Sequence, residues 1–169
     1  VEAAELPVML YDVPGRTGST IGLETYEQAL AWEPVVAVKD AVGDMPRAAR
    51  LAQMGYAVYS GDDVNTLGFL AHGACGLVSV VGHAAGSEIA SMIGDFLGGD
   101  HAAALATYQR LLPAFEAVMG PANYGATTAK AALELLGVLD NRRVRSPLVQ
   151  LDDEELAALR AGLDAAGLL

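Results

Sequence analysis

The chain has 169 residues, of which 53% are hydrophobic and 6% aromatic, and this composition suits one domain with a tightly packed core. Its formal net charge of −11 at pH 7 opposes binding to nucleic acid, and no run of Lys or Arg suits an anionic membrane surface. We find no membrane-spanning stretch and no signal-peptide pattern, and therefore expect a cytoplasmic protein.

Short apolar runs alternate with helical patterns in the first part of the chain. We predict strands at residues 7–11, 35–39, 57–60 and 77–80, and helices at residues 23–32, 46–54, 64–72 and 87–97. This alternation predicts βα units around a parallel sheet. Because ligands of parallel α/β folds bind at the carboxyl ends of the strands, we expect Tyr11 and Lys39 on the floor of one site.

Helical patterns fill the rest of the chain. We predict helices at residues 101–119 and 123–136, an arginine-rich loop at residues 140–149 and a last helix from residue 151. Asp100 is expected to cap the first of these helices, and the acidic cluster at residues 152–155 to cap the last rather than to bind a metal. The one cysteine, Cys75, is expected to be a small core residue. We divide the chain into βα units at residues 1–98 and a helical region at residues 99–169.

The number of βα units limits the choice of fold. A closed (β/α)8 barrel needs about 200 to 250 residues, and four units are too few. A curved sheet of four parallel strands would leave two open edges and an exposed apolar face. Two alternatives follow: a small open α/β domain with a helical tail, or the second half of a barrel.

Lys39 is the first candidate for chemistry. It ends the apolar run at residues 35–38, and burial lowers the pKa of an amine, so that a lysine there can attack a ketone and form an imine. The alternative is an ion pair with Asp40 or Asp44. Strand alternation sends Asp40 to the opposite face, which makes it a poor partner.

Three further residues sit in the loops after the strands. Tyr11 ends the preceding strand, where its phenol can shuttle a proton or simply pack on the rim. Arg16 follows Pro14 and Gly15, and its guanidinium suits a carboxylate ligand or a surface ion pair. Gly61 allows close approach of the backbone to a ligand, with Asp62 or Asp63 capping the next helix.

Four segments together resemble the dihydrodipicolinate synthase family. They are Tyr11-Asp12-Val13-Pro14-Gly15-Arg16-Thr17-Gly18, Val38-Lys39-Asp40-Ala41, Tyr59-Ser60-Gly61-Asp62-Asp63 and Gly76-Leu77-Val78-Ser79-Val80. The resemblance covers the whole chain but only the second half of the enzyme. It implies an α/β fold made of strands five to eight of a (β/α)8 TIM barrel, plus a C-terminal extension of three helices.

The resemblance also implies an activity and residue roles. Pyruvate would condense with aspartate semialdehyde, in the lysine and diaminopimelate pathway, through a Schiff base on Lys39. Tyr11 would relay protons, Arg16 would hold the carboxylate of aspartate semialdehyde, and Gly61 and the main chain of Val78 would line the pyruvate pocket. No cofactor or metal is implied, and the family is typically a homotetramer.

Two departures from the family pattern leave alternatives open. The loop Gly82-His83-Ala84-Ala85-Gly86 stands where many members carry an Asn and a Pro, and the family's threonine pair and partner-subunit tyrosine have no counterpart here. Another pyruvate-dependent aldolase, similar to N-acetylneuraminate lyase, and a catalytically incomplete half-barrel are the alternatives. Arg16 favours the synthase.

Overall fold

The computed structural model describes residues 6–169, which fall into two compact units. The first unit ends at Val78, and the second runs from Ser79 to Leu169. The boundary predicted after residue 98, which separates βα units from helices, remains a prediction.

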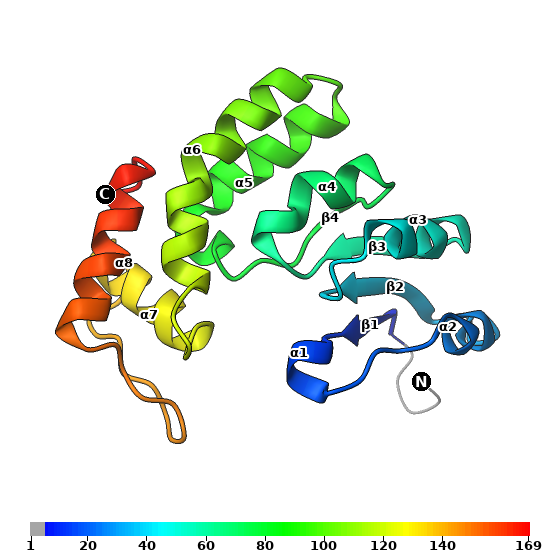
Figure 1. Ribbon diagram of the computed structural model, residues 1–169, viewed down its shortest axis with the longest axis horizontal. Helices are drawn as coiled ribbons and strands as arrows, with labels where there is room; N and C mark the ends of the chain where they lie inside the picture. Colours follow the sequence, from blue (N-terminus) through cyan, green and yellow to red (C-terminus); the bar gives the residue numbers. More distant parts are fainter. Residues whose placement is uncertain (1–5) are drawn as a thin grey trace. The chain divides into compact units, whose positions relative to one another are not determined.

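The first unit contains a parallel four-stranded sheet (Figure 1). Its strands are β1 (Val8–Asp12), β2 (Val35–Asp40), β3 (Ala57–Ser60) and β4 (Gly76–Leu77), in the order β1-β2-β3-β4. Every neighbouring pair is parallel, which confirms the predicted α/β class. The connecting helices are α1 (Pro14–Thr17), α2 (Leu23–Ala29), α3 (Met45–Gln53), the 3-10 turn η1 (Asp63–Asn65) and α4 (Thr66–Ala71).

The fourth strand is shorter than predicted. The sequence suggested residues 77–80, but only Gly76 and Leu77 pair with β3, because the last residue of β3, Ser60, is already opposite Leu77. Beyond that pair, the amide of Val78 donates to the carbonyl of Ser60 at 2.9 Å. A strand extends only as far as its neighbour can pair with it, so the apolar run at residues 78–80 lies outside the sheet.

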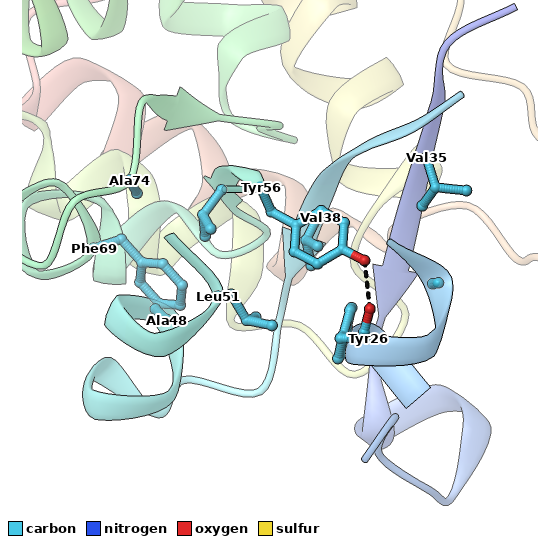
Figure 2. Packing of buried hydrophobic residues seen from close by; sticks show 10 residues of the cluster. Tyr26, Val35, Val38, Ala48, Leu51, Tyr56, Phe69 and Ala74 are labelled. Atoms are coloured by element: carbon cyan, nitrogen blue, oxygen red, sulfur yellow. Dashed lines mark hydrogen bonds between the residues drawn. The ribbon is translucent and has the colours of Figure 1, made fainter. Parts of the chain in front are cut away.

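The core of the first unit lies on one face of the sheet (Figure 2). Val38 of β2 and Val58 of β3 are buried there against Leu51 of α3 and Phe69 of α4. Tyr26 of α2 and the adjoining Tyr56 meet edge to face, with ring centroids 5.7 Å apart, and the Tyr56 hydroxyl donates to the Tyr26 carbonyl at 2.7 Å. Since strand residues alternate between faces, Met9, Tyr11 and Lys39 fall on the other face.

The second unit is helical. Its helices are α5 (Gly82–Leu97), α6 (His101–Met119), α7 (Ala126–Leu135) and α8 (Asp153–Ala165). Helix α6 packs against both α5 and α8, and Leu111, Phe115, Leu159 and Leu163 are among the buried residues. No helix within residues 6–169 is both long enough and apolar enough to cross a membrane.

The ends of these helices test the predicted caps. The Asp100 side chain accepts a hydrogen bond from the Ala103 amide, and Asp152 forms a reciprocal capping box with Glu155, as predicted. Helix α5 begins at Gly82 rather than near residue 87, but its backbone is non-helical at Ala85 (φ −131°, ψ 37°), so the predicted start corresponds to the part of the helix that follows this kink.

Candidate functional site

The ends of β1 and β2 place Tyr11 and Lys39 side by side. They are Cα partners in the parallel ladder, and the Lys39 Nζ lies 4.3 Å from the centroid of the Tyr11 ring. Tyr11 is 47% exposed and Lys39 is partly exposed. The structure therefore brings the two predicted residues together on one rim, although Lys39 is less buried than its apolar strand suggested, because it faces away from the helices that cover the core.

The neighbouring carboxylates have partners other than Lys39. Asp40 lies on the opposite face of β2 and pairs with Arg47, Nη1 to Oδ2, at 2.9 Å. Asp44 caps α3 by accepting the Arg47 amide at 3.0 Å. The ion-pair alternative for Lys39 therefore finds no support in these two residues.

Arg16 lies directly after the end of β1, on a short helical turn. Pro14 starts α1, the Arg16 amide donates to the Val13 carbonyl at 2.9 Å, and Gly18 closes the turn with a φ of 75°. Arg16 is exposed. Pro14 and Gly15 thus lie in a single turn of helix, which carries the exposed Arg16 four residues after β1 ends at Asp12.

Gly61 brings the end of β3 against the end of β2. Its amide donates to the Asp40 carbonyl at 2.7 Å, and a Cβ on Gly61 would lie 2.9 Å from the Cβ of Ala41. The close approach that the sequence suggested is therefore made to the adjacent strand end, one residue beyond Lys39. Asp62 occupies the N-cap position of η1, but its side chain makes no capping bond and instead accepts the Asn65 amide group at 3.0 Å.

Tyr59 is a neighbour of Lys39 that the sequence analysis missed. It is the Cα partner of Lys39 on β3, so tyrosines occupy the paired positions on both sides of the lysine. A hydrogen bond with Cys75 raises the pKa of Tyr59. The Tyr59 ring packs closely against Gly76, because a Cβ on Gly76 would lie 3.0 Å from the Tyr59 Cε1 atom. In the structure Tyr11, Lys39 and Tyr59 each precede the last residue of their strand, but the predicted strands ended at residues 11, 39 and 60, so this shared position could not be recognised from the sequence.

Cys75 itself is exposed, which corrects the expectation of a core residue. It follows the turn after α4 and precedes β4, and its Sγ donates to the Val58 carbonyl at 3.3 Å. Val78, beyond β4, is 36% exposed. Its amide donates to the Ser60 carbonyl at 2.9 Å.

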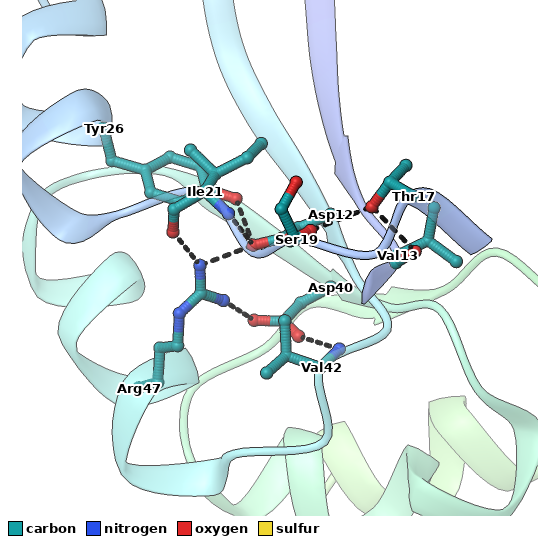
Figure 3. Close-up of polar contacts among 9 residues, drawn as sticks. All are labelled: Asp12, Val13, Thr17, Ser19, Ile21, Tyr26, Asp40, Val42 and Arg47. Atoms are coloured by element: carbon teal, nitrogen blue, oxygen red, sulfur yellow. Dashed lines mark hydrogen bonds and ion pairs between the residues drawn. The ribbon is translucent and has the colours of Figure 1, made fainter. Parts of the chain in front are cut away.

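A buried polar cluster lies behind Tyr11 and Lys39, on the core face of the same strand ends (Figure 3). Arg47 bonds Asp12, Nη2 to Oδ2, at 2.6 Å and also bonds Asp40. Both carboxylate side chains are fully buried. Burial raises the pKa of Asp40 and raises the pKa of Tyr26 to about 12. The Tyr26 hydroxyl donates to Asp12 at 3.4 Å.

The chain is similar in sequence to known proteins over nearly its whole length. The profile of the dihydrodipicolinate synthetase family matches residues 1–166. The chain belongs to this family. It is 50% identical over 164 residues to the 4-hydroxy-tetrahydrodipicolinate synthase of Kineococcus radiotolerans, a match that covers 96% of this chain and 53% of that protein. It is 47% identical to the synthase of Acidothermus cellulolyticus over 98% of this chain and 53% of that one.

Solved structures agree with the family. The crystal structure of the Cyanidioschyzon merolae enzyme with lysine bound is 38% identical, with a TM-score of 0.89 over 98% of this chain and 56% of that one. The Acinetobacter baumannii dihydrodipicolinate synthase in complex with pyruvate is 31% identical, with a TM-score of 0.90 over 99% of this chain and 58% of that one. The chain thus spans about half the length of the family members it matches.

Proposed function

We propose that this chain supplies the Schiff-base half of a 4-hydroxy-tetrahydrodipicolinate synthase, corresponding to strands five to eight of a TIM barrel and the helical extension. The complete enzyme condenses pyruvate with aspartate semialdehyde in lysine and diaminopimelate biosynthesis. One observation carries the proposal: the Lys39 amine lies 4.3 Å from the Tyr11 ring at paired strand ends. The contact is between the amine and the face of the ring, and it places a nucleophile for imine formation and a phenol that can carry protons on neighbouring strand ends.

The chemistry begins at Lys39. Its neutral amine attacks the ketone carbon of pyruvate, and loss of water leaves an imine, with Tyr11 passing the protons that the nitrogen loses and the departing oxygen gains. Loss of a methyl proton gives an enamine, whose carbon attacks the aldehyde of the second substrate. The amine of that substrate then displaces Lys39 from the imine, which closes the ring and frees the lysine.

Other residues supply binding. Arg16 holds the carboxylate of aspartate semialdehyde through two parallel hydrogen bonds, which an arginine is shaped to make. The Val78 carbonyl contacts pyruvate, and Gly61 keeps the backbone close to the site. The A. baumannii relative in complex with pyruvate supports this ligand class for the family. We expect a cytoplasmic homo-oligomer, as is typical of the family.

The isolated chain is expected to be weakly active at most. Catalysis by positioning depends on groups held from all sides, and the matched relatives are about twice as long as this chain. The part of the Kineococcus relative outside the match, which we expect to be its N-terminal half, can be joined to this chain to complete the barrel.

The test is borohydride trapping with pyruvate, on the chain alone and on that fusion, followed by peptide mass spectrometry. Lys39 and Lys130 are the two lysines of this chain, so Lys130, in the second unit, is an internal control for unselective modification. A reduced pyruvate adduct on Lys39 in either form, lost in K39M and kept in K130M, supports the proposal. Absence of the adduct in both folded forms, or equal labelling of both lysines, overturns it.

A further inference from the structure

Beneath the rim that carries Tyr11 and Lys39, two acids occupy paired positions. Asp12 and Asp40 end β1 and β2, are Cα partners, and have fully buried side chains. Like charges directly opposite each other in a sheet push the strands apart. The pairing of these strand ends therefore depends on a cation between the two carboxylates.

Arg47 supplies that cation from the first turn of α3. Its Nη2 bonds Asp12 Oδ2 at 2.6 Å and the Ile21 carbonyl at 2.7 Å, while its Nη1 bonds Asp40 Oδ2 at 2.9 Å (Figure 3). Its side chain is 11% exposed. One guanidinium thus links three segments: the end of β1, the end of β2 and the loop that follows α1.

A second hydrogen bond fixes the loop between α1 and α2 at Ile21. The Ile21 amide donates to the same Asp12 Oδ2 at 3.1 Å, so both polar groups of the Ile21 main chain join the cluster. Asp12 relies on this arrangement, because its other carboxylate oxygen is buried without a partner among the described residues. Removing Arg47 would leave Asp12 with one main-chain amide and the long bond from Tyr26.

Each of the bridged acids directly follows a residue of the proposed site. Asp12 follows Tyr11, and Asp40 follows Lys39, with alternation placing the members of each pair on opposite faces. A shift at the buried position is therefore transmitted through one peptide unit to the rim. The loop held at Ile21 is the continuation of α1, which carries Arg16.

From this geometry we infer that Arg47 is a positioning residue for imine formation, because it sets the spacing of Lys39 and Tyr11 from the opposite face of the sheet. The inference rests on the proposed function of Lys39. Arg47 does not reach the rim, so its effect passes through the strand ends. A displacement of about 1 Å at a reacting group can cost about a hundredfold in rate.

Lysine is expected to replace Arg47 poorly. An ammonium is a compact charge, whereas the guanidinium fork reaches Asp12 and Asp40 at once through two nitrogens. R47K should therefore keep the charge balance and the fold while loosening the spacing. R47M removes both the charge and the fork.

The experiment measures the rate of pyruvate trapping on Lys39 in whichever form of the protein, chain or fusion, traps it. We expect R47K to slow trapping at least about fivefold and R47M at least about tenfold, at saturating pyruvate and per mole of folded protein, because geometry rather than pyruvate affinity is changed. Y56F is the matched control, since it removes a buried hydrogen bond of 2.7 Å to the Tyr26 carbonyl in the same unit and leaves every bond made by Arg47 in place.

The outcomes separate the two claims. The positioning role is supported if R47K traps pyruvate slowly while Y56F stays within about twofold of the wild-type rate. This result supports it even if R47M fails to fold. Wild-type rates in R47K, or equal slowing in Y56F and R47K, overturn it while leaving the Lys39 assignment intact. A wild-type protein that forms no Lys39 adduct overturns the proposed function, and the positioning role falls with it.

Discussion

Replacing Gly61 with alanine tests how the strand end beside Lys39 is packed. The new Cβ would lie 2.9 Å from the Ala41 Cβ and 3.1 Å from the Asp40 carbonyl oxygen. Carbon atoms in contact lie about 3.5 Å apart or more, so the methyl group would be about 0.6 Å too close. The atoms it meets belong to the backbone or to a Cβ, and no flexible side chain can move aside.

The ends of β2 and β3 must therefore separate in G61A, which strains the 2.7 Å bond from the Gly61 amide to Asp40. Overpacking of this kind costs about 1–3 kcal/mol. For a protein of this size, that corresponds to a fall in Tm of about 2–12 °C.

Urea unfolding followed by Trp32 fluorescence measures this cost, because Trp32 is the one tryptophan and lies in the first unit. G15A is the control within the same unit: Gly15 lies in α1, and a Cβ there meets nothing within 4 Å. The control should be neutral or stabilising by up to about 1 kcal/mol. A G61A midpoint at or above that of wild type would refute the packing argument.

Two further predictions concern stability. Burial raises the pKa of Tyr26 from 10.0 to about 12, so between these pH values the folded chain keeps a proton that the unfolded chain loses. The contribution of this group to the unfolding free energy is therefore complete below about pH 10 and is lost as the pH rises toward 12. Y26F should therefore lose unfolding free energy less steeply than wild type across pH 10–12, and parallel curves would contradict the assignment. D152A should lower stability by about 1 kcal/mol by removing the capping box of α8. D164A is the control, because Asp164 is exposed in the last turn of the same helix, where a carboxylate is unfavourable, so its loss should lower stability less. Urea unfolding followed by far-UV circular dichroism measures both variants, and equal losses of stability would argue against the cap.

Much of the local structure follows from the sequence alone. Apolar runs separated by turn residues predicted β3 with the bounds observed, and the helical pattern after Asp100 predicted the bounds of α6. Both signals are local, since strand and helix periodicity and an N-cap side chain depend on residues close together in the chain. The placement of Tyr11 and Lys39 on one rim also followed, because parallel strands place their carboxyl ends together.

Pairing between distant segments was decided by the tertiary structure. The length of β4 depended on where β3 ended, and no local pattern records that limit. Arg47 belongs to the helix predicted at residues 46–54, and only folding brought it between Asp12, 35 positions earlier, and Asp40. Tyr59 likewise became a neighbour of Lys39 through the register of β2 and β3. The sequence by itself predicted which residues carry the proposed chemistry, and it correctly predicted that Tyr11 and Lys39 lie on one rim. Only the tertiary structure revealed the bridge from Arg47 to Asp12 and Asp40 at the same strand ends, because such a buried ion pair is a long-range contact that leaves no periodic trace in the chain.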